Sequence, residues 1–378
     1  LFEAPVLADL ARRIEDARQD GERASLPAIL RVDRDRPLPL SFAQQRLWFL
    51  DQLEPGSAFY NVPAAVRLHG VLDVAALHRT LNEVVRRHES LRTRFVTRDG
   101  VAVQEIAAVL EVDLPVLDLS ALDDDKRQQQ LHAQLQTQAT QPFDLSDGPL
   151  IRAALMRLGE ADHVVTLTLH HIVSDGWSMG VLVHEVAALY EAFERGEASP
   201  LRALPVQYAD YAHWQREWLS GAVLERQLDY WRGQLGDAPP LLTLPTDRPR
   251  PAVQRHRGAM HPFTIDAATT GGLHALARRA RGTLFMALSA AFGVLLARHA
   301  GQDDICIGTP VANRRHAQTE ALIGFFVNTL VLRQRIAGHE TFETLLARTR
   351  EVTLGAYAHQ DVPFEQLVEV LRPQRSLG

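Results

Sequence analysis

The chain has 378 residues, of which 46% are hydrophobic and 23% are charged, enough to form a large core and to divide into two domains or lobes. Its net charge of −6 and isoelectric point near 6.3 argue against a nucleic-acid-binding protein, because that function needs a basic excess. A single cysteine, Cys306, excludes an internal disulfide framework. The sequence shows no signal peptide and no apolar run near the ~20 residues of a membrane span. We therefore expect a protein of the reducing cytoplasm.

Residues 1–18 have the spacing of a short amphipathic helix, with Pro5 at its first turn. The apolar residues on one face are Leu7, Leu10, Ala11 and Ile14. Such a helix can simply pack on the next domain as a cap. Residues 19–36 are rich in arginine, aspartate and proline, which predicts a linker between domains.

The next elements alternate between helix and strand. Asp73 is placed to cap a helix that carries Leu77, Leu81, Val84 and Val85. Residues 162–171 predict a strand, because valine, threonine and leucine dominate and no glycine or proline interrupts the run. With a period of two, His171 shares a face with Val165, Leu167 and Leu169, and His170 shares the other with Val164, Thr166 and Thr168.

A turn and a second helix follow this strand. Asp175 and Gly176 open the turn, Ser178 is a plausible N-cap and Gly196 lies beyond the helix end. The apolar positions at helical spacing are Leu182, Val186, Leu189 and Phe193. A histidine at the end of an apolar strand face, ahead of a helix N-terminus, can stand where a buried face becomes a channel wall. His171 is therefore a candidate for proton transfer.

Three other interpretations of His171 remain open at this point. A histidine on an apolar face is most often a satisfied core residue. A metal site is disfavoured because adjacent strand histidines face apart and no HExxH or CxxC partner is present. A serine hydrolase would need a GxSxG elbow, which the sequence lacks.

The second half of the chain begins with a proline-rich stretch. Residues 236–258 contain five prolines and can neither stay helical nor sit in a central strand, so we interpret them as a crossover between lobes. Thr283 is placed to cap a helix, and residues 341–356 and 363–371 predict two more, the last with proline at its first position. Periodicity alone indicates an α/β or α+β protein.

Six motifs in one order resemble those of the condensation domains of nonribosomal peptide synthetases. They are Ser41–Leu50, Arg87–Phe95, the HHxxxDG stretch from His170 to Gly176, Tyr208–Gln215, Ile307–Asn328 and His359–Phe364. The family resemblance implies an α/β (α+β sandwich) fold of two chloramphenicol-acetyltransferase-like lobes in a V-shaped pseudo-dimer. In this fold the active site lies in a tunnel between the lobes.

The resemblance also implies a domain organisation. Residues 1–18 are similar to the last helix of an upstream peptidyl carrier domain, and 19–36 form the linker. The N-terminal lobe is expected at 37–215 and the C-terminal lobe at 216–378. A seventh motif would begin near Arg375, so this lobe is expected to be truncated.

The implied reaction is amide bond formation. The amine of an aminoacyl thioester on a downstream carrier attacks the thioester on the upstream carrier. Both substrates are delivered on 4'-phosphopantetheine arms, without ATP, a metal or a bound cofactor. His171 matches the position usually assigned as base or as stabiliser of the tetrahedral intermediate. The implied partners are the two carrier domains and a neighbouring adenylation domain, with no nucleic acid and no membrane.

Other motif residues have supporting roles. Asp175 either orients the base or locks the turn by pairing with an arginine, for which Arg314 and Arg92 are the candidates. His170 supports the motif from the opposite strand face. Gly176 either lets its backbone approach the thioester or permits a positive φ.

Candidates to line the channel are Trp177, Ser178 and Asn328. A capping or turn role is equally ordinary for Asn328, and the tryptophans at 48, 177 and 214 are typical packing residues.

Details of the opening and histidine motifs resemble the branch that accepts an L-configured donor. Two functions of other classes remain. A stand-alone acyl-CoA-dependent acyltransferase of the same fold would share HHxxxDG but would need no carrier remnant. A non-catalytic recruitment platform would usually have a degraded histidine motif.

Overall fold

The computed structural model describes residues 7–9, 11, 12, 15, 26–249 and 258–371. The chain divides into two compact units. The first, here called the histidine unit, comprises Ala28–Ser220 and Ala312–Val327. The second, here called the C-terminal unit, comprises Leu1–Pro27, Gly221–Val311 and Asn328–Gly378.

The two units differ from the predicted lobes in three places. The histidine unit begins at Ala28, inside the predicted linker of residues 19–36, rather than at residue 37. The boundary falls after Ser220 rather than at 215, because helix α6 (Tyr208–Trp218) continues through the predicted boundary. Residues 312–327, which the sequence analysis placed in the C-terminal lobe, belong to the histidine unit, because their backbone binds side chains of that unit. The tunnel between lobes stays a prediction.

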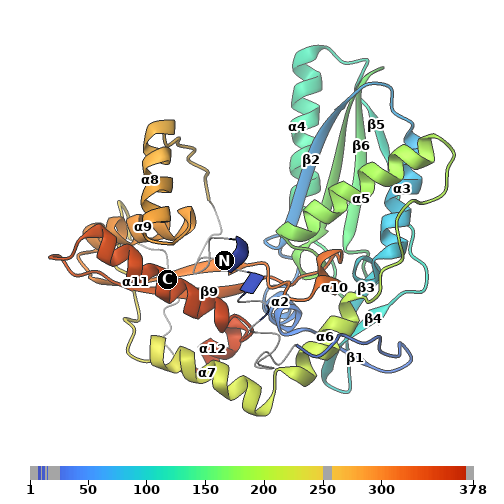
Figure 1. The fold of residues 1–378 in the computed structure, drawn as a ribbon. Coiled ribbons are helices and arrows are strands. Elements are labelled where there is room, and N and C mark those ends of the chain that lie inside the picture. The colour runs from blue at the N-terminus through green and yellow to red at the C-terminus, as the bar shows by residue number, and fades with distance from the viewer. Residues whose placement is uncertain (1–6, 10, 13–14, 16–25, 250–257, 372–378) are drawn as a thin grey trace. The chain divides into compact units, whose positions relative to one another are not determined.

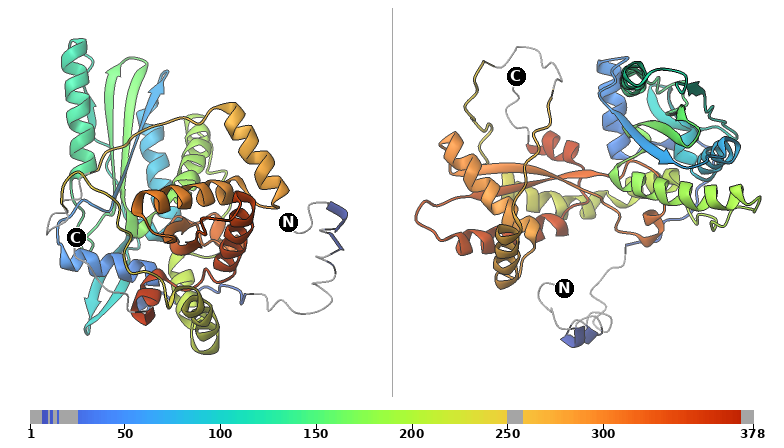
Figure 2. Two further views of the ribbon diagram at one scale, coloured as in Figure 1. Left: turned by 90° about the vertical axis from the view of Figure 1, so that its left-hand side faces the viewer. Right: turned by 90° about the horizontal axis from the view of Figure 1, so that it is seen from above.

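The histidine unit is built on a mixed four-stranded sheet. The strand order is β2 (Asn61–His69), β7 (Asp162–His170), β6 (Ile151–Gly159) and β5 (Val116–Asp118). Helix α4 (Asp124–Thr140) lies on one face of this sheet, and α3 (Val74–Arg87) and α5 (Gly176–Glu194) lie on the other (Figures 1 and 2). Burial between the layers forms the main core of this unit.

A smaller antiparallel sheet completes the histidine unit. It joins β1 (Leu38–Pro39), β4 (Val101–Ile106) and β3 (Thr93–Arg98), and the single turn η1 (Glu89–Arg92) leads into β3. Helices α2 (Phe42–Leu53) and α6 flank it, and the short α10 (Ala317–Glu320) belongs to the returning segment.

Within the described residues from Gly221 onward, the C-terminal unit contains a two-stranded antiparallel sheet and five helices. The strands are β8 (Asp304–Val311) and β9 (Asn328–Arg335). The helices are α7 (Gly221–Leu235), α8 (Ala267–Arg279), α9 (Leu284–Ala300), α11 (Phe342–Ala358) and α12 (Phe364–Leu371). The described part of the proline-rich stretch, 236–249, has no helix or strand, as predicted.

Local rules predicted the helix starts well. Asp73 caps α3 by accepting the backbone N–H of Ala76, and Thr283 caps α9 in the same way. The predicted apolar face of α3 is buried. These predictions were confirmed because capping and amphipathic spacing depend only on neighbouring residues.

The two ends of the chain are described only in part. Residues 7–9, 11, 12 and 15 are helical, in agreement with the expected helix, whereas Leu10 and Ile14 lie outside the described residues. Residues 19–25 of the predicted linker also lie outside them, and 26–36 have no helix or strand. The stretch near Arg375 is likewise outside the described residues. The carrier remnant and the truncation stay predictions.

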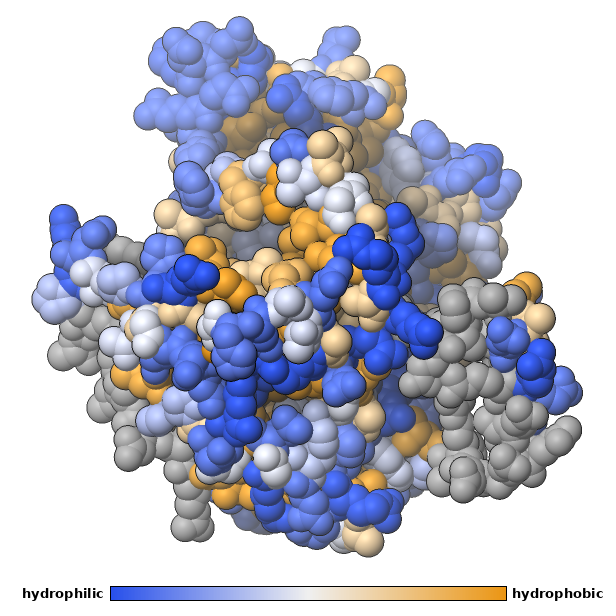
Figure 3. Space-filling view, turned by 60° about the vertical axis from the view of Figure 1, so that its left-hand side comes forward, coloured by the Kyte–Doolittle hydropathy of each residue, from blue (hydrophilic) through white to orange (hydrophobic). Residues whose placement is uncertain are grey.

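The molecular surface is mainly hydrophilic on the face drawn in Figure 3, with apolar side chains exposed between the polar ones. Among the described helices, none alone is long and apolar enough to cross a membrane, although the bent pair α8 and α9 together has the necessary length and composition.

Candidate active site

Strand β7 ends at His170, one residue earlier than predicted. His171 begins a short 3-10 turn, His171–Val173, so it does not continue the strand face of Leu169. The chain turns here because the His170 Nδ1 accepts the backbone N–H of Ile172 at 3.1 Å. A side chain that bonds its own backbone two residues on competes with the strand pattern.

His170 is a buried residue that supports the turn. It lies on the strand face predicted for it, is only 3% exposed, and packs near the rings of Tyr60 and Phe143. Burial lowers the pKa of His170 to about 4, and the neighbouring charge of His171 adds to this effect. His170 is therefore neutral at physiological pH, and its Nε2 carries the proton because its Nδ1 is an acceptor.

His171 is half-buried, and its hydrogen bond fixes its tautomer. The Nδ1 lies 2.6 Å from the carbonyl oxygen of Ser174, which can only accept, so Nδ1 carries the hydrogen and Nε2 carries the lone pair. No hydrogen bond occupies Nε2 within the described chain. The ring of Phe325 packs against the imidazole, with centroids 4.7 Å apart and planes at 62°. Nε2 can therefore accept a proton or, once protonated, donate a hydrogen bond.

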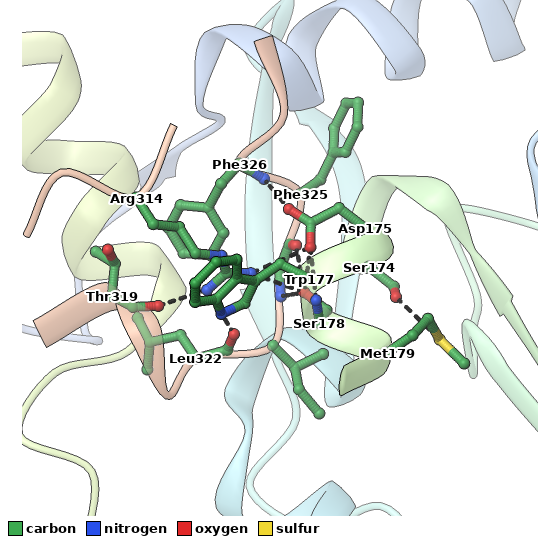
Figure 4. Close-up of polar contacts among 12 residues, drawn as sticks. Ser174, Asp175, Trp177, Ser178, Met179, Arg314, Thr319, Leu322, Phe325 and Phe326 are labelled. Atoms are coloured by element: carbon green, nitrogen blue, oxygen red, sulfur yellow. Dashed lines mark hydrogen bonds and ion pairs between the residues drawn. The ribbon is translucent and has the colours of Figure 1, made fainter. Parts of the chain in front are cut away.

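Asp175 is fully buried and is the N-cap of α5, a role that the sequence analysis gave to Ser178. Its carboxylate accepts the backbone N–H and the hydroxyl of Ser178, the Arg314 guanidinium at 3.1 Å and the backbone N–H of Phe326 at 3.0 Å (Figure 4). These donors use the lone pairs of both oxygens, and none of them is His171. Of the two roles considered for Asp175, the geometry supports the second, in which the carboxylate stabilises the turn by pairing with an arginine.

Arg314 is the partner that the sequence analysis named first. Its side chain is 1% exposed, and it donates to the carbonyl oxygens of Thr319 and Leu322 and to the Ser178 hydroxyl. Its guanidinium also lies over the ring of Phe326 (Figure 4). Burial lowers the pKa of Arg314, and the Asp175 carboxylate opposes that shift. A buried pair of this kind is costly to break because either partner alone would remain charged inside the protein.

Arg92, the other candidate partner, does not contact Asp175. It donates to the carbonyl of Ala107 and lies 3.8 Å from the carboxylate of Glu89. Of the two candidate partners, the structure therefore gives Arg314, since η1 directs Arg92 to the smaller sheet.

The candidate channel residues lie in different environments. Trp177 is 47% exposed, donates through Nε1 to the carbonyl of Glu320, and lines a groove of about 760 Å³ with Gly176, Gly180 and His184. Ser178 is buried among Asp175, Arg314 and the backbone of Gly324, so it cannot line a channel.

Asn328 binds the backbone of the sixth motif. Its amide donates to the carbonyls of Gln360 and Val362, and its oxygen accepts the N–H of Phe364 at the start of α12. Asn328 is buried and has the capping role, which was one of the two considered.

Gly176 begins α5 with an ordinary negative φ, so the structure excludes one of its two alternatives, a positive φ. A Cβ built at Gly176 would meet no atom within 4 Å. Its backbone therefore lies open beside the motif, which leaves the close approach of a substrate as its remaining role.

Residues 322–326, here called the 322–326 segment, were quoted within the fifth motif but not singled out from the sequence. All five bind a side chain through their backbone, and Phe325 and Phe326 point in different directions, Phe326 toward Arg314 (Figure 4). The Gly324-Phe325-Phe326 triplet could have pointed to this segment in the sequence. A glycine beside large side chains can mark a place where another group closely approaches the backbone. In the described chain, no group of three or more metal-ligating side chains is placed to hold an ion.

Comparison with known proteins gives the family. Residues 35–378 match the model of the condensation domain. The chain is 52% identical over 378 residues to one of the linear gramicidin synthase proteins of Brevibacillus parabrevis, and 50% identical over the same length to another. All of this chain is covered in both cases, but it spans only 7% and 5% of the lengths of these relatives.

Solved structures agree. The X-domain from teicoplanin biosynthesis in its complex with OxyB matches with a TM-score of 0.85 and 32% identity, covering 93% of this chain and 77% of that one. The first condensation domain of the CDA synthetase matches with a TM-score of 0.73 and 25% identity, covering 89% and 79%. This chain belongs to the condensation domain family of nonribosomal peptide synthetases, acyltransferases that form peptide bonds.

Proposed function

We propose that this chain transfers the aminoacyl or peptidyl group of an upstream carrier-bound thioester, with an L-configured terminus, to the amine of an aminoacyl thioester on a downstream carrier. Phosphopantetheine arms on the two carriers deliver the substrates, an adenylation domain supplies the acceptor, and the reaction takes place in the cytoplasm. The observation that carries the proposal is the imidazole of His171, with its Nδ1–H held by Ser174 and its Nε2 lone pair available.

The chemistry needs one nucleophile and one proton carrier. The acceptor's ammonium group first loses a proton to solvent, and its nitrogen then attacks the thioester carbonyl to form a C–N bond and a tetrahedral intermediate. The C–S bond breaks, and the departing thiolate takes up a proton to become the thiol of the donor arm. The Nε2 of His171 accepts the proton of the attacking amine and returns it to the sulfur.

The magnitudes indicate how much His171 contributes. Proton transfer by a positioned side chain typically contributes about 10²–10⁴-fold. Orientation of two tethered reactants contributes about 7–11 kcal/mol, which is larger. We therefore propose that binding both arms supplies most of the rate, and that His171 supplies the proton transfer.

The rest of the motif acts as a rigid support. The buried Asp175–Arg314 pair fixes the turn that carries Ser174, whose carbonyl orients the imidazole. Gly176 leaves room beside the turn for the thioester.

A second candidate is recruitment of a separate enzyme. It is favoured by the likeness to the X-domain, which was solved in complex with OxyB. The hydrogen-bonded tautomer of His171 weighs against it, because a docking platform has no use for an oriented lone pair.

Mass spectrometry of the carriers can separate these functions. The protein is mixed with an upstream carrier bearing a donor thioester and a downstream carrier bearing an aminoacyl thioester. We expect the donor mass to move to the downstream carrier. Equal efficiency with a free CoA thioester donor would instead indicate an acyl-CoA acyltransferase, and binding of carriers without any transfer would favour recruitment.

A further inference from the structure

A buried cluster of charged and titratable side chains in the histidine unit has no part in the mechanism above. His88 lies at the end of α3 and Glu185 in the middle of α5, and both are buried. The Nε2 of His88 lies 2.9 Å from the Glu185 carboxylate, and Arg87 donates to both oxygens of the same carboxylate. Two helices are thereby joined by a charged group where apolar packing would have sufficed.

The cluster extends to the 322–326 segment. The Nδ1 of His88 accepts the backbone N–H of Ile323 at 3.2 Å, so the hydrogen of the neutral ring is on Nε2, directed at Glu185. The Ser90 hydroxyl donates to the carbonyl of Ile323 at 2.7 Å. Ile323 is therefore held on both of its backbone groups by the second sequence motif.

Phe325, two residues further on, contacts the imidazole of His171. The imidazole is thus fixed at one edge by the Ser174 carbonyl and across its ring by Phe325. Rotation of the ring about its side-chain bonds would lose both contacts. The direction of the Nε2 lone pair therefore depends on where the segment holds Phe325.

We propose that His88 and Glu185 are positioning residues for the reaction, which hold Ile323 so that Phe325 keeps the His171 imidazole in its productive orientation. The inference rests on the proposed function of His171. Neither residue contacts the reacting atoms, and each acts through the 322–326 segment.

The hydrogen bonds that link Glu185, His88 and Ile323 are here called the clamp. The 322–326 segment has other anchors, so loss of the clamp need not unfold the unit. The Ser178 hydroxyl accepts the backbone N–H of Gly324, Tyr208 donates to the carbonyl of Phe325, and Asp175 accepts the N–H of Phe326. Removing the Glu185 carboxylate loosens Ile323 while these contacts remain, but it also leaves the buried Arg87 guanidinium without its counter-charge and lowers stability. We therefore expect a fall in kcat that exceeds the fall in a control variant with a comparable loss of stability.

The test compares four variants in the carrier-to-carrier transfer assay. Glu185→Leu removes the acceptor for His88, whereas Glu185→Gln keeps an oxygen there. Phe325→Leu leaves the clamp intact but removes the aromatic contact. Leu131→Ala is the matched control, because Leu131 is buried in a separate cluster under α4 and its truncation lowers stability without touching the clamp.

We expect kcat to fall by about 10- to 100-fold in Glu185→Leu and Phe325→Leu with KM unchanged, because a misplacement of this kind costs up to about 100-fold. Glu185→Gln should recover most of the rate, and Leu131→Ala should lower the melting temperature but leave kcat unchanged. In nitrogen-15 NMR of labelled histidines, the Nδ1–H signal of His171 should be sharp in the parent and broadened in Phe325→Leu.

The outcomes separate the two hypotheses. If His171→Ala transfers at the parent rate, the proposed function is wrong. If His171→Ala is impaired while Glu185→Leu and Phe325→Leu keep the parent kcat and His171 signal, the positioning role is wrong and the function stands. A fall in kcat of Leu131→Ala equal to that of Phe325→Leu would also overturn the positioning role, since lost stability would then explain both.

Discussion

The two adjacent histidines of the motif carry their protons on opposite nitrogens. His170 accepts at Nδ1 from Ile172, so its hydrogen is on Nε2, whereas His171 donates from Nδ1 to Ser174, so its lone pair is on Nε2. One ring is buried and neutral, and the other is half-buried, with an acceptor nitrogen that no hydrogen bond occupies among the described residues. The same residue type thus stabilises a turn at one position and offers a base at the next.

The roles of single residues were predictable from the sequence to different degrees. Arg314 could be named as a candidate partner of Asp175, because a carboxylate past the end of a strand can lock the turn by pairing with an arginine. His171 was expected on the strand because period two continues by default. The side-chain bond from His170 that ends the strand has no signature in the alternation of apolar residues.

The charge of Asp175 should matter more than its shape. Asp175→Asn keeps the volume but leaves the Arg314 guanidinium buried without a counter-charge. We expect the free energy of unfolding to fall by about 3–5 kcal/mol in urea titrations. Asp162→Asn is the control, because Asp162 pairs with Arg67 on the surface and its loss should cost less than about 1 kcal/mol. Equal losses in the two variants would contradict the structural role of Asp175.

At the scale of elements, helices were predictable and the 322–326 segment was not. The caps at Asp73, Thr283 and Thr341 depend on the next three residues, so the sequence contains their whole cause. The bond from Phe326 to Asp175 joins residues 151 positions apart, and no local pattern contains it. The segment is therefore visible only once the fold brings it to α5.

Gly324 makes the segment sensitive to one methyl group. A Cβ at this position would lie 2.0 Å from Cδ2 of Tyr208, whose ring is buried and cannot move aside. We expect Gly324→Ala to lower the free energy of unfolding by about 1–3 kcal/mol through overpacking, measured by thermal unfolding. Gly176→Ala is the matched control, since its Cβ enters open space and should leave the melting temperature unchanged. An unaltered melting temperature in Gly324→Ala would show that the ring of Tyr208 can give way.

At the scale of the whole molecule, the chain leaves the C-terminal unit at Val311 and returns to it at Asn328. The intervening residues complete the support of His171 from the second half of the sequence. A division of the chain at a single boundary cannot represent this return of residues 312–327 to the histidine unit. The return explains why Arg314 of the fifth motif, which follows the crossover, is the partner of Asp175 of the third.

The histidine unit should lose stability in mild acid through His170. Its pKa is about 4 in the folded protein and about 6.5 in the unfolded chain, so the unfolded state binds the proton first. The contribution is fully present above pH 6.5 and is lost as the pH falls through 4, amounting to about 3 kcal/mol at the low end. Urea titrations from pH 7 to 4 should show this slope, and His170→Asn should reduce it. The same slope in both proteins would contradict the shifted pKa.

The central claim is that the Nε2 of His171 moves the proton during peptide transfer. The most direct measurement is the single-turnover rate of transfer between two loaded carriers, compared between the parent and His171→Ala at equal melting temperature. The account predicts a rate lower by about 10²–10⁴-fold, with both carriers still bound, because orientation remains and proton transfer is lost. A His171→Ala protein that transfers at the parent rate would contradict it.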